Sequence, residues 1–270
     1  MKTIAKLIYA IATSALLASC GGIEQTTLDS GPLKYGQLAQ FNVNGPNLDK
    51  GITLVAPKCA GITAIAGGTA TQQSYNCTPS ATGLITVMVV GGNVVLRQAD
   101  FTIPIPQVTL KTSLGDIALD LNPTAAPLSV NNFLQYVNSG FYSNLIFHRV
   151  VMTPFSIIQG GGFDASFSLP ATNAPITLES NNGLTNLRGT LAMARTSVPD
   201  SATSQFYINV ADNPAFDYVS AAQPGYAVFG KVASGLPVVD AIAAVPTGIR
   251  GTMSDVPLTD VVILSATQTR

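Results

Sequence analysis

Short apolar runs separated by glycine, proline and asparagine cover most of the chain, and this pattern predicts a mainly β protein. In residues 32–105 the runs carry no helical period. The apolar run 84–90 is followed by a Gly-Gly-Asn turn and a second run at 94–96, which is typical of a β-hairpin. We therefore expect residues 32–105 to form a small all-β domain of sandwich-like architecture.

Pro104 and Pro106 mark a boundary, because two prolines so close together favour an extended link. Beyond them, apolar runs at 108–112 and 116–121 flank a Ser-Leu-Gly turn and predict a second hairpin. Further short strands are predicted at residues 190–195, 205–209, 227–232 and 260–265. About eight short strands favour a closed barrel over residues 106–270, since closure leaves no exposed strand edge.

Two helices are predicted within the barrel segment. One begins at Pro127, and its apolar positions recur at the spacing of a single helix face, at Val130, Phe133, Leu134 and Val137. Gly140 ends it, and a second helix is predicted at residues 237–244, again with proline in the first turn. These apolar faces are expected to belong to the core.

The stretch FHRVVMTPFSIIQGGGF, residues 147–163, carries the chemistry that stands out. The stretch reads as an apolar strand, a turn around residues 152–155 and a second extended piece. The first strand contains His148, the only histidine, and Arg149, one of few charged residues. Side chains alternate along a strand, so we expect these two to face opposite ways.

The first twenty residues read as a leader rather than as part of the fold. Lys2 and Lys6 precede an apolar core at residues 7–17, which is too short for a comfortable membrane span, and Leu-Ala-Ser-Cys follows. This ending resembles the lipobox of bacterial lipoproteins, which implies cleavage after residue 19 and lipidation of Cys20. An ordinary signal peptide with a chance cysteine is the alternative. Residues 20–31 are expected to be a flexible tether. The protein is then anchored outside the cytoplasm, on the outer membrane facing the periplasm if the cell is Gram-negative.

Cys59 and Cys77 are the other two cysteines of the chain, and both precede the barrel segment. An oxidising compartment favours a disulfide between them. Closing a loop of this length stabilises a fold by on the order of 3 kcal/mol. Two buried free thiols in adjacent strands are the alternative.

Composition excludes several classes of function. Only 10% of the 270 residues are charged and the net charge is −1, so the chain has no electrostatic footprint for nucleic acid. A single histidine and the lack of clustered carboxylates argue against a metal site, and we expect no cofactor. A serine or cysteine hydrolase is also disfavoured, because the chain has no G-x-S-x-G motif and no cysteine after residue 77.

Five segments together resemble a cyclophilin-type peptidyl-prolyl cis-trans isomerase of the bacterial kind: GFYSNLIFHRV, IIQGGGF, ESNNGLTNLRGTLAMART, SATSQFYINV and YAVFGKV. They follow the order and nearly the spacing of that family, over roughly residues 106 to 268. The resemblance implies a closed eight-stranded barrel with two helices that isomerises X-Pro bonds in proline-containing polypeptides without a cofactor. Such an enzyme would assist the folding of exported proteins. The alternative is a proline-peptide-binding or chaperone module on the same fold with little turnover.

The resemblance also assigns roles to residues. Arg149 corresponds to the catalytic arginine, Phe155 to the floor of the proline pocket, and Gln159 to the side chain that binds substrate backbone and helps hold Arg149. Further substrate-binding positions are Ala194, Arg195, Thr196, Gln205, Tyr207, Phe216 and Tyr226. Between residues 150 and 159 the chain is about two residues longer than the family pattern, so either Ile157 or Ile158 fills the pocket position. His148 is expected to be structural.

Overall fold

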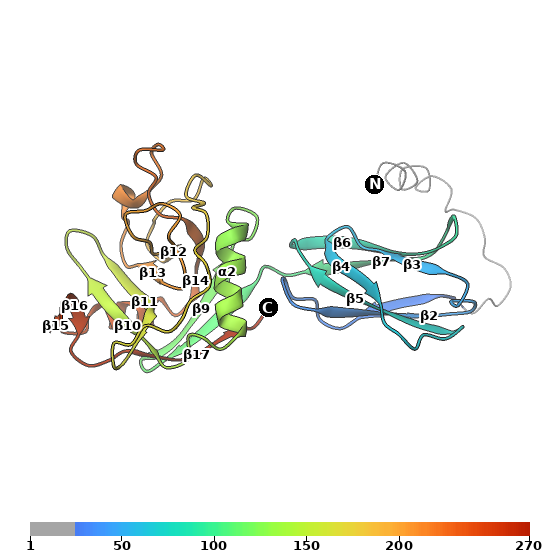
Figure 1. Cartoon of the computed structure of the whole chain (residues 1–270), viewed down its shortest axis with the longest axis horizontal. Coiled ribbons are helices and arrows are strands. Elements are labelled where there is room, and N and C mark those ends of the chain that lie inside the picture. Colours follow the sequence, from blue (N-terminus) through green and yellow to red (C-terminus); the bar gives the residue numbers. More distant parts are fainter. Residues whose placement is uncertain (1–24) are drawn as a thin grey trace. The chain divides into compact units, whose positions relative to one another are not determined.

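A computed structural model describes residues 25–270 (Figure 1). The chain divides into two compact units between Ile103 and Pro104. The expected signal peptide, Cys20 and the first part of the expected tether lie outside the described residues. No helix in the described part is long and apolar enough to cross a membrane.

The first unit consists of two antiparallel sheets. One has the strand order β1-β2-β5-β4 and the other the order β3-β6-β7. The strands are β1 (Thr27–Ser30), β2 (Ala39–Asn44), β3 (Ile52–Val55), β4 (Cys59–Ala64), β5 (Gln72–Pro79), β6 (Gly83–Gly91) and β7 (Val94–Ile103). The ring of Phe41 in one sheet lies 5.1 Å from that of Phe101 in the other, so the two sheets enclose a shared core.

Alternation of side chains explains how this core forms. In β6 the residues Ile85, Val87 and Val89 are buried, whereas Leu84, which precedes them and points to the opposite face, is exposed, as expected for a strand with one face in a core. Cys59 in β4 and Cys77 in β5 form a disulfide with a Cα–Cα distance of 5.4 Å. The disulfide joins two neighbouring strands of the same sheet.

One expectation for this unit is wrong. Residues 27–30, which we expected in the flexible tether, form β1 and pair with β2. The physical reason is that Leu28, opposite Val43, is buried in the core. A strand with a single apolar residue among Thr, Asp and Ser gives almost no hydrophobic signal in the sequence.

The second unit is a closed barrel of eight antiparallel strands in the order β10-β11-β13-β12-β14-β9-β8-β17, and it confirms the predicted fold class (Figure 1). Its strands are β8 (Gln107–Thr112), β9 (Gly115–Leu121), β10 (Leu145–Val151), β11 (Ile157–Asp164), β12 (Thr190–Met193), β13 (Phe206–Asn209), β14 (Val228–Ser234) and β17 (Val262–Gln268). The pairing of β10 with β17 closes the barrel.

Two α-helices in the described residues pack on the barrel, α2 (Pro127–Asn138) and α3 (Leu236–Ala243). The carboxylate of Glu179 caps the first turn of α2, because its oxygens accept hydrogen bonds from the backbone N–H groups of Leu128 and Ser129 at 2.9 and 2.7 Å. A carboxylate is favourable there because the N-terminal N–H groups of a helix lack partners within the helix. The sequence did not predict the 3-10 helix η1 (Pro214–Phe216) or the hairpin of β15 (Thr247–Arg250) and β16 (Met253–Pro257).

Aromatic rings fill the barrel core. Phe133 of α2 lies within 5.3–5.5 Å of the rings of Tyr142, Phe206 and Phe229, and Phe147 of β10 lies 6.1 Å from Phe206. All five are fully buried. Core packing of Phe147 and Phe206 therefore fixes β10 and β13 in position. The same two strands carry residues of the candidate site on their other face.

Candidate active site

A single row of paired residues crosses five strands of the barrel. Arg149 in β10 pairs with Gln159 in β11, Gln159 with Tyr207 in β13, Tyr207 with Ala192 in β12, and Ala192 with Val228 in β14. Residues directly opposite each other in an antiparallel pair point to the same face of the sheet. The pairing register therefore places these five side chains on one face, although they are far apart in sequence.

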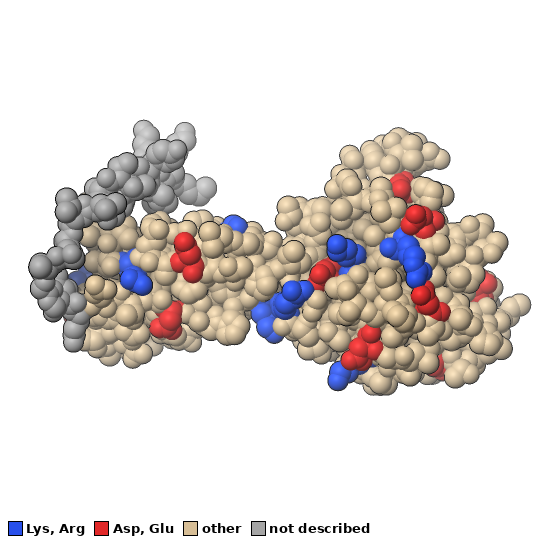
Figure 2. Space-filling model, turned by 180° about the vertical axis from the view of Figure 1, so that it is seen from behind, with Lys and Arg blue, Asp and Glu red and all other residues tan. Residues whose placement is uncertain are grey.

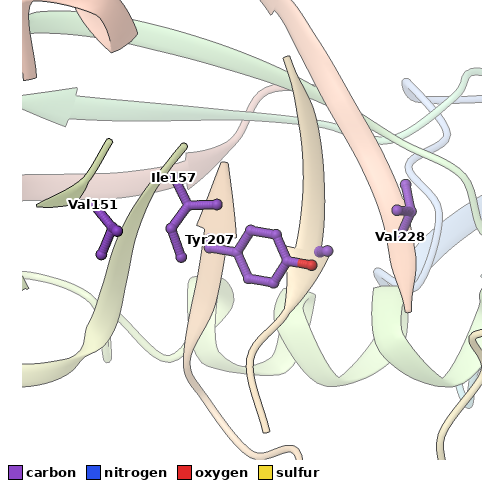
Figure 3. Close-up of a cluster of buried hydrophobic side chains, with 5 residues drawn as sticks. Val151, Ile157, Tyr207 and Val228 are labelled. Carbon is purple, nitrogen blue, oxygen red and sulfur yellow. The ribbon is translucent and has the colours of Figure 1, made fainter. Parts of the chain in front are cut away.

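The middle of this face is an apolar cluster. Val151, Ile157, Ala192, Tyr207 and Val228 are buried against one another, and in Figure 3 the ring of Tyr207 lies between Ile157 and Val228. Partly buried apolar residues pack over them, namely Phe155, Leu184, Ala194, Phe216 and Tyr226. The cluster is thus an apolar floor with walls that remain accessible from outside.

Four aromatic rings contact one another here, Tyr207 of the floor and Phe155, Phe216 and Tyr226 of the walls. Phe155 lies 4.9 Å from Phe216, Phe216 lies 5.1 Å from Tyr226, and Tyr207 lies 5.8 Å from both Phe216 and Tyr226. Most of these ring pairs are tilted or edge-to-face, which is the favoured geometry for aromatic contacts. An apolar ring such as a proline side chain matches these surroundings in polarity.

Arg149 lies at the edge of the apolar cluster and is partly exposed. Its Nη1 donates to Oε1 of Gln159 at 3.4 Å, and its guanidinium carbon lies 5.5 Å from the centroid of the Phe155 ring. Gln159 in turn donates from Nε2 to Oε1 of Gln205 at 2.9 Å. The two glutamines therefore hold a guanidinium beside the aromatic walls.

The structure distinguishes Ile157 from Ile158. Ile157 belongs to the apolar cluster, whereas Ile158 points to the opposite face of β11 and is completely buried. Of the two alternatives, Ile157 therefore lies on the face of the candidate site, and Ile158 belongs to the barrel core. The turn at residues 152–156, which contains a cis Thr153–Pro154 bond, carries Phe155 back against Phe216 despite the extra residues.

The segment after β12 contributes Ala194, Arg195 and Thr196. Ala194 packs against the cluster and Thr196 is exposed. The side chain of Arg195 turns toward the neighbouring loop, where Nε and Nη2 donate to the carbonyl oxygen of Gly225 at 3.0 and 2.7 Å. Its guanidinium carbon lies 4.7 Å from the centroid of the Tyr226 ring. Arg195 thus joins the strand side of the site to the wall formed by Tyr226.

A buried polar network behind the aromatic walls was not predicted. The hydroxyl of Tyr207 donates to Oδ1 of Asn186 at 2.7 Å, and the backbone N–H and Nδ2 of Asn186 donate to Oδ1 of Asp217 at 2.6 and 3.0 Å. Asp217 follows Phe216, so this network fixes the floor residue Tyr207 and the wall residue Phe216 relative to each other. Asn186 lies in a polar loop where nothing in the sequence shows which asparagine is buried.

The same network reaches the loop that carries Phe155. Nδ2 of Asn209 donates to Oδ1 of Asn186 at 3.2 Å, and Nδ2 of Asn213 donates to Oδ1 of Asn209 at 2.7 Å. Oδ1 of Asn213 accepts the backbone N–H of Ser156 at 3.1 Å. Buried polar groups that are fully hydrogen-bonded fix a unique geometry, and here they fix the pocket walls relative to one another.

His148 lies beneath the site rather than in it. It is 1% exposed, and its ring lies 4.8 Å from that of Phe163. Burial lowers the pKa of His148 to about 4, against smaller opposing contributions from the Ile146 backbone and the Gln205 side chain. Nδ1 has no hydrogen-bond partner among the described residues. His148 is therefore neutral at neutral pH.

Burial also raises the pKa of the Tyr207 hydroxyl well above its usual value, so this group acts as a neutral donor. Within residues 25–270, no three His, Cys, Asp or Glu side chains come close enough together to hold a metal ion. This face offers a guanidinium held by a glutamine, two side-chain amides and a cluster of apolar and aromatic side chains, which suits binding of a peptide rather than nucleophilic attack.

A closed eight-stranded barrel with an arginine, a glutamine and an aromatic cluster on one face is typical of a cyclophilin-type protein. The family model described as "Cyclophilin type peptidyl-prolyl cis-trans isomerase/CLD" matches residues 107–268, and the chain belongs to this family. The barrel is accordingly a peptidyl-prolyl cis-trans isomerase of the cyclophilin type.

Relatives and solved structures agree with this assignment. The chain is 55% identical over 158 residues to a peptidyl-prolyl cis-trans isomerase of Acinetobacter baylyi, covering 58% of this chain and 82% of the relative. It is 49% identical over 162 residues to peptidyl-prolyl cis-trans isomerase B of Escherichia coli, covering 59% and 98%. A crystal structure of a Cryptosporidium parvum cyclophilin type isomerase matches with a TM-score of 0.51 at 26% identity, covering 61% of this chain and 98% of that one. The same Cryptosporidium enzyme in the presence of the dipeptide Ala-Pro matches with a TM-score of 0.50.

Proposed function

We propose that the face around Arg149 is the catalytic groove, and that it binds proline-containing polypeptides and accelerates rotation about their X-Pro bonds. The observation that carries this proposal is the position of the Arg149 guanidinium at the edge of a pocket lined by Phe155, Tyr207 and Phe216. The isomerases related to this chain, one of them solved in the presence of Ala-Pro, support the substrate class.

The physical chemistry of the reaction fits these residues. Rotation about a peptide bond crosses a barrier of about 18–20 kcal/mol because resonance is lost in the twisted amide. No covalent bond breaks and no proton has to move, so neither a nucleophile nor a general acid is needed. A donor to the prolyl nitrogen helps, because the lone pair of that nitrogen becomes available as resonance is lost. An arginine is always charged and offers a fixed fork of donors.

Magnitudes show that Arg149 does not act alone. A hydrogen bond to a charged group is worth about 1.5–3 kcal/mol. A roughly million-fold acceleration requires about 8 kcal/mol. The remainder must come from the pocket, which removes water and holds the proline ring in place while the preceding carbonyl rotates.

The long Arg149–Gln159 hydrogen bond of 3.4 Å is consistent with this role. Catalytic hydrogen bonds in an unliganded site are often long and shorten when substrate is bound. Gln159 is itself held by Gln205, so it orients the guanidinium without neutralising its charge. The donors of Arg149 therefore stay available for a substrate.

The decisive experiment measures kcat/KM on an X-Pro peptide for the full chain and for Arg149→Ala. We expect a loss of about a hundredfold or more, the range found when a transition-state donor is removed. Arg270→Ala is the matched control, because Arg270 forms an ion pair with Asp120 away from the groove and should leave kcat/KM unchanged. Equal activity of Arg149→Ala and the wild type would refute the proposed role of Arg149.

The same experiment tests the alternative of a proline-peptide-binding or chaperone module. In that case the wild type binds X-Pro peptides, but its rate of isomerisation does not exceed the uncatalysed rate. Arg149→Ala then changes peptide affinity alone.

We further propose that the enzyme is a lipoprotein that acts on exported proteins, attached through Cys20 to the outer membrane and facing the periplasm. Lys2 and Lys6, the apolar run 7–17 and the ending Leu-Ala-Ser-Cys support this. The Cys59–Cys77 disulfide is also consistent with an oxidising compartment.

A further inference from the structure

The arginines of the barrel fall into two groups. Arg188, Arg250 and Arg270 each form an ion pair with a carboxylate, that of Asp240, Asp260 and Asp120 respectively. Arg149 and Arg195 are the other two arginines after residue 103, and neither forms an ion pair within residues 25–270. Both lie on the groove, where they contact the aromatic walls through Phe155 and Tyr226.

Arg195 is held in place although its charge is not neutralised. Nε and Nη2 donate to the carbonyl oxygen of Gly225, and Nη1 donates to that of Thr196 at 2.8 Å. A guanidinium has five N–H donors, so one remains on each terminal nitrogen. Because the side chain is already ordered, binding an anion there loses little conformational entropy.

Acidic residues beside the groove do not cancel this charge completely. Asp217 follows the wall residue Phe216, and its Oδ1 accepts two hydrogen bonds from Asn186. Asp200 lies in the segment after Thr196, and its Oδ1 accepts the backbone N–H of Leu178 at 2.8 Å. Both carboxylates are thus engaged with neutral donors of the protein. Arg149 and Arg195 therefore supply the charged donors of the groove that no carboxylate of residues 25–270 pairs with.

We propose that Arg195 makes the groove selective for polypeptides that carry a carboxylate side chain within two residues of the proline. The inference rests on the proposed function, because it requires that the substrate lie along Ala194–Thr196 and against Tyr226. In the proposed function Arg149 donates to the prolyl nitrogen. Arg195 is then the cation that can bind the carboxylate of a flanking acidic residue. An exposed or partly exposed ion pair supports a preference of about two- to fivefold.

The test uses pairs of short peptides of the form Ala-Ala-Pro-Ala-Ala in which glutamate or its neutral isostere glutamine replaces one alanine at a time. With the full chain at pH 7, we expect kcat/KM for glutamate to exceed that for glutamine about two- to fivefold at one position at least. The preference should shrink in about 0.5 M salt, which screens exposed charges. Arg195→Gln should remove it, Arg195→Lys should keep part of it, and Arg270→Gln should leave it intact.

Two results would overturn the proposal. One is equal kcat/KM for glutamate and glutamine at every position, and the other is a preference that survives in Arg195→Gln. If no peptide is turned over at all, the proposed function fails instead. Titration calorimetry of the same glutamate and glutamine peptides then decides the preference from their dissociation constants, with the same expected ratio and the same variants.

Discussion

His148 is the neighbour of Arg149 in the sequence, yet the two residues have different surroundings. It is the only histidine and precedes Arg149, but the structure buries it against Phe163 and gives it no place on the groove. A neutral imidazole is the form that burial favours, because desolvation penalises the charged form. We therefore expect His148 to affect the stability of the fold and not to transfer protons.

The lowered pKa of His148 predicts a pH dependence of stability. The unfolded chain takes up a proton near pH 6.5, whereas the folded chain resists it until about pH 4. The neutral imidazole of His148 therefore makes its full contribution to the free energy of unfolding above about pH 6.5. This contribution, about 3 kcal/mol, is lost as the pH falls to about 4. In His148→Gln this part of the pH dependence should be missing.

Urea denaturation of the full chain at pH 7 and pH 4.5, followed by near-ultraviolet circular dichroism, measures the effect. The free energy of unfolding should fall by about 2–3 kcal/mol more in the wild type than in His148→Gln between these two pH values. Lys111→Gln, an exposed change on β8, should behave like the wild type. If His148→Gln shows the full wild-type loss, the imidazole is not buried in its neutral form.

Residues that act through their chemical type could be predicted, whereas those that act through packing could not. The family pattern singled out Arg149 and Gln159, and the structure places them opposite each other and within hydrogen-bond distance, while their roles stay predictions. The choice between Ile157 and Ile158 needed the register of β11 against β13, which places Gln159 opposite Tyr207. The two side chains have the same chemistry, so only the face that each occupies separates them.

At the scale of elements, strongly periodic segments were predicted well and irregular ones were not. The helix at Pro127 and the hairpin of β8 and β9 follow from apolar spacing and turn residues. The strand β1 and the loop around Asn186 have too few apolar residues to give a signal. Their structures depend on partners more than ten residues away, Val43 for β1 and Tyr207 for Asn186.

The hydrogen-bond network around Asn186 predicts that the positions of the groove loops depend on the hydroxyl of Tyr207. Tyr207→Phe keeps the ring of the pocket floor but removes the donor to Oδ1 of Asn186, which then retains only Asn209 as a donor. We expect a loss of about 1–2 kcal/mol in the free energy of unfolding. Because Phe216 and Asp217 are held through the same asparagine, KM should rise by about two- to fivefold, while kcat should change little since Arg149 is untouched.

Steady-state kinetics and urea denaturation of Tyr207→Phe measure these two effects together. Tyr218→Phe is the matched control, because Tyr218 is 36% exposed and lies outside the polar network. A Tyr207→Phe enzyme with wild-type KM and wild-type stability would show that the hydroxyl does not hold the walls. A loss in kcat alone would mean that the change reaches Arg149 instead.

At the scale of the whole molecule, charge is too sparse to determine where the protein binds. The net charge is −1, and Figure 2 shows few charged residues on the face in view, with both signs interspersed. Basic patches are what attract proteins to anionic membranes. Attachment to a membrane would therefore have to come from acyl chains on Cys20, each buried CH₂ contributing about 0.8 kcal/mol.

This argument predicts how the protein responds to salt and to the exchange of its leader. Expressed with its leader in a bacterium that processes lipoproteins, the wild type should sediment with membranes and should stay there in about 1 M salt, which screens charges beyond about 3 Å. A variant in which a cleavable leader without a lipobox replaces residues 1–20 should be released into the soluble extracytoplasmic fraction with unchanged kcat/KM, because every groove residue lies after residue 103. Cys59→Ser with Cys77→Ser is the control that removes cysteines without removing the anchor. Release of the wild type by salt, or membrane retention of the variant with the exchanged leader, would mean that contacts other than acyl chains hold the protein.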